Sequence, residues 1–169
     1  VKLAAPADGQ IVVQQRFLSL DPYMRPRMTE LRSYTPPFDL DKPLTGGSVG
    51  EVVESKNPRY QPGDQVVGFG GWQLYSAVNA EQPGALRQVD TTHVPLSHYL
   101  GAVGMPGVTA WYGLVKIIAP KAGDTVVISA ATGAVGSAFA ALAKARGCRV
   151  VGIAGGPDKC RYAVEELGY

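Results

Sequence analysis

Cysteine and histidine are scarce in this sequence of 169 residues, with two of each. Cys148 and Cys160 are too few for a disulfide scaffold, so we expect a reducing compartment and a cytoplasmic location. The histidines, His93 and His98, form no metal-ligand spacing with each other or with the cysteines. The sequence therefore predicts no metal site, and no Ser-His-Asp grouping can be assembled from it.

Net charge and long apolar runs are also lacking. The formal net charge is +2 and the basic residues are scattered, which gives no support for a nucleic-acid or membrane surface. No run is long enough to span a bilayer, and there is no signal-peptide pattern. Because 46% of the residues are hydrophobic, we expect a globular protein whose partner is a small molecule.

The first part of the chain has the pattern of an antiparallel β domain. From Gln10 to about Val89, short β-like runs alternate with turn residues such as Gln61-Pro62-Gly63-Asp64, which predicts a barrel-like fold. Five prolines make residues 21–43 a poor helix and a loop that could shape a substrate pocket. Between Pro95 and Val115, helical spacing predicts two short helices with a break at Pro106.

A second domain is predicted from Pro120 onward. Strand 125–129 runs into Ala130-Ala131-Thr132-Gly133-Ala134-Val135-Gly136, and an alanine-rich helix follows that ends at a Gly147 cap. Its apolar face carries Val135, Phe139 and Leu142. A strand at 149–154, expected to be buried on both faces, precedes a helix from Pro157 that buries Cys160, Val164 and Leu167.

This β-α-β-α unit has two strands, whereas a complete dinucleotide domain has about six. The sequence also begins at Val1 without an initiator Met and stops at Tyr169. We therefore expect part of a longer protein, with weak or no catalysis in these residues alone.

The turn before the first of these helices indicates nucleotide binding. A helix N-terminus offers free N–H groups and partial positive charge to a pyrophosphate. The usual G-x-G-x-x-G pattern is incomplete here because Ala131 replaces the first glycine, but the strand before and the helix after stand where the mechanism needs them. The alternative is that Gly133 and Gly136 only permit tight packing in a domain that binds nothing.

The end of the second strand favours NADP over NAD. An NAD site usually has Asp or Glu there, whereas this chain has Ala154-Gly155-Gly156, with Lys159 and Arg161 following in the next helix. Asp158 opposes this reading, unless it serves the helix dipole, and Lys159 could be an ordinary exposed lysine.

Four segments together resemble the zinc-independent medium-chain dehydrogenase/reductases, in the branch with prostaglandin (leukotriene B4), alkenal double-bond and curcumin reductases. The matching segments are residues 20–25 (Leu-Asp-Pro-Tyr-Met-Arg), 104–110 (Gly-Met-Pro-Gly-Val-Thr-Ala), the glycine turn through Gly136, and 148–156. The match covers nearly the whole chain but only about the first half of such a protein.

The resemblance implies a GroES-like catalytic domain at residues 1–119, present in part, followed by the N-terminal part of a Rossmann domain at 120–169. It assigns Gly133, Ala134, Val135 and Gly136 to the pyrophosphate, and Gly155 and Lys159 to the 2′-phosphate end. Met105 and Thr109 match positions near the nicotinamide. Tyr23 matches a pocket tyrosine near the reacting centre, although it could equally be a loop aromatic packed on the barrel.

The implied reaction reduces the C=C bond of α,β-unsaturated aldehydes or ketones, with hydride transfer from NADPH to the β-carbon. Gly46-Gly47-Ser48 stands where zinc-dependent relatives carry Gly-His-Glu, which favours a metal-free reaction. The alternatives are a zinc-free quinone oxidoreductase and a non-catalytic nucleotide-binding relative. The resemblance also implies a homodimer at full length.

Overall fold

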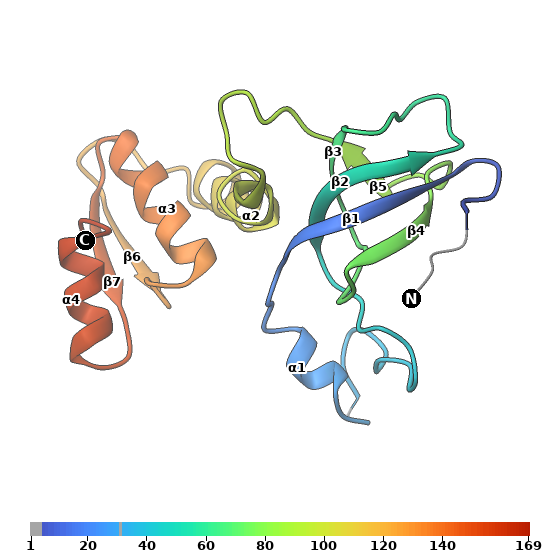
Figure 1. Ribbon diagram of the computed structural model, residues 1–169. Helices are drawn as coiled ribbons and strands as arrows, with labels where there is room; N and C mark the ends of the chain where they lie inside the picture. The colour runs from blue at the N-terminus through green and yellow to red at the C-terminus, as the bar shows by residue number, and fades with distance from the viewer. Residues whose placement is uncertain (1–4, 31) are drawn as a thin grey trace. The chain divides into compact units, whose positions relative to one another are not determined.

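The computed structural model describes residues 5–30 and 32–169, and the chain divides into two compact units. The first unit ends at Leu100 and the second runs from Gly101 to Tyr169 (Figure 1). Each is built around its own sheet, antiparallel in the first and parallel in the second.

The first unit is a five-stranded antiparallel sheet in the order β4-β1-β2-β3-β5. Its strands are β1 (Gln10–Leu18), β2 (Ser48–Ser55), β3 (Gln65–Gly68), β4 (Tyr75–Asn79) and β5 (Leu86–Gln88). The register between β1 and β2 shifts twice, and such irregularities bend a strand, which helps the sheet to curl. The predicted antiparallel β pattern is confirmed.

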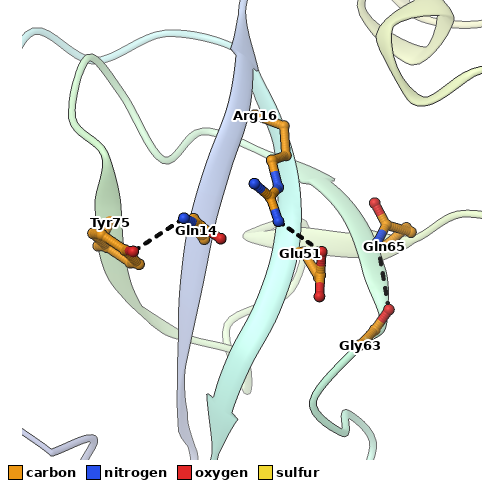
Figure 2. Close-up of polar contacts among 6 residues, drawn as sticks. All are labelled: Gln14, Arg16, Glu51, Gly63, Gln65 and Tyr75. Atoms are coloured by element: carbon orange, nitrogen blue, oxygen red, sulfur yellow. Dashed lines mark hydrogen bonds and ion pairs between the residues drawn. The ribbon is translucent and has the colours of Figure 1, made fainter.

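The concave side of this sheet holds a closed apolar core, while polar groups tie its strands together elsewhere. Five buried residues, from β1, β2, β3 and the position just after β4, form the core: Ile11, Val13, Val52, Val66 and Ala80. Figure 2 shows the polar contacts, with Arg16 Nη2 3.0 Å from Glu51 Oε2 and Gln14 Nε2 donating to Tyr75 Oη at 3.0 Å. In β1 the consecutive residues Ile11, Val12 and Val13 are all buried, while the residues from Gln14 onward are partly buried or exposed.

The predicted proline-rich loop at 21–43 contains one short helix, α1 (Met24–Arg27). Pro26 lies inside this single turn. Arg27 organises the loop that follows: its Nε donates to Pro36 O at 2.8 Å, its Nη1 donates to Thr45 Oγ1 at 3.1 Å, and its guanidinium lies 4.0 Å from the centre of the Phe38 ring. The Phe38 N–H also donates to Arg27 O at 2.9 Å, so the side chain and the backbone of Arg27 together hold the loop against α1.

The second unit contains three α-helices and one π-helical segment beside two parallel strands. In chain order, these elements are α2 (Met105–Tyr112), the π-helical segment η2 (Gly113–Ile118), β6 (Thr125–Ser129), α3 (Ala134–Ala145), β7 (Arg149–Ile153) and α4 (Pro157–Glu165). The predicted β-α-β-α order is confirmed, and β6 pairs with β7 in parallel.

The predicted break at Pro106 is wrong. A 3₁₀ segment, η1 (Leu96–Leu100), ends before it, and Pro106 lies in the first turn of α2. Proline is tolerated there because first-turn N–H groups have no partner within the helix. Gly101 carries the interruption instead, since its carbonyl accepts hydrogen bonds from the N–H groups of Gly104 and Gly107.

The core of the second unit draws on both strands, α3 and η2. Its buried members are Leu114, Val126, Ile128, Ala140, Ala143, Cys148 and Val150, with Phe139 and Leu142 packed against them. Gly147 caps α3 as predicted: its φ is +75°, its N–H donates to Lys144 O, and the Cys148 N–H donates to Ala143 O. Because α2 and η2 pack with α3, the compact units divide at 100/101, and the predicted domain boundary at 119/120 stays a prediction.

Two burial predictions in this unit are wrong, and a third holds in part. The strand pair is buried on one face only, with Val127 60% and Ile153 59% exposed, because α3 covers the opposite face. On α4 the buried residue is Ala163, whereas Cys160 and Val164 are exposed and line an open hollow beside β7. On α3, Phe139 and Leu142 pack against the core as predicted, whereas Val135 is 37% exposed.

Candidate cofactor site

The loop between β6 and α3 makes a tight turn that ends at a helix N-terminus. Ala130 leaves β6 with a left-handed φ of +49°, and the Gly133 N–H donates to Ala130 O at 2.9 Å, which closes the turn. Gly133 is the N-cap of α3, so the chain passes from strand to helix within four residues.

Gly136 occupies a position where a side chain does not fit. A Cβ added there would lie 2.5 Å from Ala130 O and 2.7 Å from Ala131 O, both of them backbone atoms. At Gly133 the corresponding approach, to Ala130 O, is a milder 3.2 Å. The missing side chain at Gly136 lets the first turn of α3 sit directly against the end of β6.

The N-terminus of α3 leaves its first amides available for an anion. The cap is a glycine without a side-chain acceptor, and in the described residues no side chain caps the helix. Ser137, the nearest hydroxyl, instead donates back to Gly133 O at 2.8 Å. The N–H groups of Ala134, Val135 and Gly136 therefore combine with the positive end of the helix dipole, and this geometry fits a pyrophosphate.

Ala131, in place of the usual first glycine, is fully buried at the end of β6. Its N–H donates to Ile153 O at 3.1 Å, which continues the pairing of the two strands beyond β6. A Cβ added at Gly152 would lie only 2.8 Å from the Ala131 Cβ. The glycine on the neighbouring strand thus provides the space that the Ala131 methyl occupies, a compensation that a one-segment motif does not reveal.

A second loop lies at the same edge of the sheet. Ser129 pairs with Ile153 in the parallel ladder, so the loops after β6 and β7 both leave from the carboxyl ends of the strands (Figure 1). In this second loop, Gly155 has open space where a Cβ would be, and Gly156 is the N-cap of α4 with φ +84°. No carboxylate stands at residues 154–156 to repel a 2′-phosphate.

The pairing of the charged side chains at the start of α4 favours the binding of a phosphate. Asp158 Oδ1 lies 3.2 Å from Arg161 Nη2, so the acid that opposed the NADP prediction is paired with one of the two basic residues. The described residues show no ion pair for Lys159, which is exposed. Lys159 is accordingly the cation available to a ligand at this edge.

Met105 and Thr109 lie one turn apart on α2, the helix that packs against α3. Both are exposed, and Thr109 Oγ1 donates to Met105 O at 2.8 Å. Gly107 between them faces Ala102 O so closely that a Cβ has no room, which fixes the start of α2 against the preceding loop. Their predicted contact with the nicotinamide stays a prediction.

Tyr23 belongs to the first unit, where it is the N-cap residue of α1 and is half-buried. Burial and the nearby Asp21 carboxylate raise the pKa of its hydroxyl above the usual value of 10.0, and the Arg27 charge opposes that rise. The hydroxyl therefore stays protonated at neutral pH and can donate a hydrogen bond.

Two features of these regions were not predicted from the sequence. One is the set of contacts that Arg27 makes with Pro36, Thr45 and Phe38, called the Arg27 hub below, and the other is the contact of Tyr169 with the glycine loop. Each joins residues at least nine positions apart. No local spacing signals them, although a buried small residue facing a tyrosine is the kind of pair that an alignment can reveal.

Within residues 5–30 and 32–169, no group of three or more His, Cys, Asp and Glu side chains could hold a metal ion. None of the helices described there has both the length and the apolar character needed to cross a membrane. The predicted zinc independence stays a prediction.

Comparison with known proteins gives these observations a family. The family described as the N-terminal domain of oxidoreductase matches residues 1–86. The chain belongs to this family. Its two units also superpose on a crystal structure of CurA in complex with NADPH from Vibrio vulnificus, with a TM-score of 0.88 and 41% identity, covering 100% of this chain and 49% of that one.

Among curated relatives, the chain is 47% identical to the NADPH-dependent curcumin reductase of Escherichia coli (strain K12), over 99% of this chain and 48% of that protein. It is 42% identical to the 2-alkenal reductase (NADP(+)-dependent) of Nicotiana tabacum, over 100% of this chain and 49% of that protein. The chain thus spans about half the length of these relatives. The predicted resemblance to this branch and the predicted fold class are confirmed.

Proposed function

We propose that this protein is an NADPH-dependent reductase of the C=C bond in α,β-unsaturated aldehydes and ketones. The observation that carries the proposal is the loop between β6 and α3, where Gly136 admits no side chain and three amides are open, in a chain 47% identical to an NADPH-dependent curcumin reductase. Lys159 beside the neutral 154–156 loop supports the phosphorylated cofactor.

In this proposal Gly133, Ala134, Val135 and Gly136 hold the pyrophosphate through backbone amides. Gly155 gives access to the 2′-phosphate, and Lys159 pairs with it. Met105 and Thr109 contact the nicotinamide end. NADPH, when bound, supplies the hydride that the β-carbon of the substrate receives, and a proton at the α-carbon completes the reduction.

Tyr23 is the residue proposed for the substrate side. As hydride reaches the β-carbon, negative charge develops on the carbonyl oxygen of the substrate, and a positioned donor lowers the barrier to that step. A tyrosine hydroxyl is protonated at neutral pH, and the raised pKa of Tyr23 extends its donor form to higher pH. It is therefore suited to donate to that oxygen.

The test is a steady-state assay of the protein at its natural full length, following NADPH absorbance with enones, alkenals and quinones. Consumption with enones and alkenals is expected. Tyr23→Phe should lower kcat about tenfold or more, since a donor aimed at developing charge is worth a few kcal/mol. Tyr34→Phe is the matched control because Tyr34 is 84% exposed.

Preference for quinones over enones would indicate a quinone oxidoreductase. NADPH binding without turnover of any of these substrates would contradict the proposed reaction and leave a non-catalytic nucleotide-binding protein. The homodimer and the cytoplasmic location remain proposals as well, checked by sedimentation of the same full-length protein and by fractionation of cells that express it.

A further inference from the structure

The hydroxyl of Tyr169 lies between the two ends of the cofactor loop. Tyr169 Oη is 3.0 Å from Gly136 O and 3.3 Å from Ala131 O. Ala131 is where the chain leaves β6, and Gly136 is in the first turn of α3, so the two acceptors flank residues 132–135. One hydroxyl proton serves both carbonyls as a three-centre hydrogen bond, shorter on the Gly136 side.

Tyr169 is itself held in place from three directions. Its N–H donates to Ala163 O at 3.0 Å, and its ring packs against the apolar core of the second unit. The ring also lies over Gly152, where an added Cβ would come within 2.8 Å of Tyr169 Cδ1. The same absent side chain leaves room for the Ala131 methyl. The absence of a side chain at Gly152 thus leaves room for both Tyr169 and Ala131, which the hydrogen bond from Tyr169 Oη to Ala131 O joins.

The hydroxyl is suited to its two acceptors. Burial raises the pKa of Tyr169 above 10.0, so the group is a donor throughout the neutral range. Each carbonyl oxygen has two lone pairs, which lets Gly136 O accept from Tyr169 as well as within α3. Both hydrogen bonds are made to carbonyl oxygens, so they occupy none of the loop amides.

We propose that Tyr169 is a positioning residue that bridges Ala131 and Gly136 and so holds the loop amides in their binding arrangement before NADPH arrives. The inference rests on the proposed cofactor site. A loop already fixed loses less conformational freedom on binding, and this raises affinity without any new contact to the ligand. Loss of one such hydrogen bond corresponds to about a two- to tenfold change in an equilibrium constant.

The experiment compares wild type with Tyr169→Phe, which removes the hydroxyl and keeps the ring that packs in the core. The matched control is Tyr162→Phe, because Tyr162 is a half-exposed tyrosine on α4 with no side-chain hydrogen bond among the described residues. Two quantities are measured on the protein at its natural full length: amide hydrogen exchange without ligand, and the Kd for NADPH by calorimetry.

In Tyr169→Phe we expect exchange at residues 132–136 to rise two- to tenfold, exchange at Val126–Ile128 in β6 to stay at the wild-type rate, and the Kd to rise by a similar factor. Unchanged loop exchange, or a uniform rise across the second unit, would overturn the bridge and leave the proposed function intact. If wild type binds no NADPH, the proposed function fails, while the exchange measurement still decides whether Tyr169 fixes the loop.

Discussion

The cofactor loop of the second unit and the region around Tyr23 in the first unit are fixed by different means. The cofactor loop of the second unit depends on backbone geometry: a left-handed Ala130, a glycine N-cap and a Gly136 that admits no Cβ. The region around Tyr23 in the first unit depends on side chains, chiefly Arg27 with its contacts to Pro36, Thr45 and Phe38. The backbone constraint at Gly136 leaves no room for any side chain, whereas contacts made by a side chain can be weakened in steps.

The largest expected effect is at Gly136. In Gly136→Ala the new Cβ meets two backbone oxygens that cannot turn away, so the first turn of α3 must shift. We expect a loss of about 2 kcal/mol in unfolding free energy. Misplacing even one or two of the three amides should weaken NADPH binding by about a hundredfold.

Calorimetry with NADPH and urea unfolding measure the two effects. Gly155→Ala is the control for stability, since a Cβ there meets nothing within 4 Å and its φ is not positive. If Gly136→Ala bound NADPH like wild type, the steric account of the loop would be wrong.

A smaller effect is expected at Lys159, where a side chain supplements the backbone site. Lys159→Ala should raise the Kd for NADPH about tenfold, as expected for one charge-assisted contact, and should leave the Kd for NADH unchanged. Lys121→Ala is the matched control because Lys121 precedes β6 and lies at the opposite end of that strand. Equal weakening of both nucleotides would show that Lys159 does not read the 2′-phosphate.

The side-chain hub should respond in degrees. Arg27→Met removes two hydrogen bonds and the charge over Phe38, and we expect about 1 to 2 kcal/mol of destabilisation. Arg27→Lys keeps the charge but loses the planar geometry of the guanidinium, so its unfolding free energy should lie between those of wild type and Arg27→Met. Arg25→Met, on the same helix and without a side-chain hydrogen bond in the described residues, should unfold like wild type.

If Arg27→Met and Arg25→Met were equally stable in urea unfolding, the side-chain contacts of Arg27 would not stabilise the loop as we propose. A loss in Arg27→Lys as large as that in Arg27→Met would show that the geometry of the guanidinium, and not its charge, holds the loop.

The smallest expected effect is on the unfolding free energy at alkaline pH. Burial raises the pKa of both Tyr23 and Tyr169 above their unfolded value, so the folded protein binds more protons than the unfolded chain at pH above about 10. Their contribution to stability is therefore constant below pH 10 and falls as the pH rises through the folded pKa values. Urea unfolding between pH 8 and 11 should show a smaller decline in the double variant Tyr23→Phe/Tyr169→Phe than in wild type.

Much of the second unit could be predicted because its signals are local. A strand, a glycine turn and an alanine-rich helix follow one another within residues 125–147, and Gly147 ends the helix as glycine usually does. Burial on α4 could not be predicted, because helical periodicity shows which residues share a face and not which face finds a partner. Cys160 and Val164 share a face, yet it borders an open hollow.

In the first unit, the antiparallel runs were evident from alternation and turn residues, but the hub at Arg27 was not. Its partners Pro36 and Thr45 lie 9 and 18 positions away in a loop without periodicity. The space that Gly152 provides for Ala131 could not be predicted either, because the partners are again distant in the sequence. Only the register of β6 with β7 brings the two residues together.

The central claim is that the amides at the start of α3 and the lysine at the start of α4 together bind NADPH. An NMR titration of the ¹⁵N-labelled protein at its natural full length, with NADPH and with NADH, tests it most directly. We predict that the amide signals of Ala134, Val135 and Gly136 shift with both nucleotides, and that those around Lys159 shift more with NADPH. Shifts that leave residues 133–136 unmoved at saturating NADPH would contradict the account.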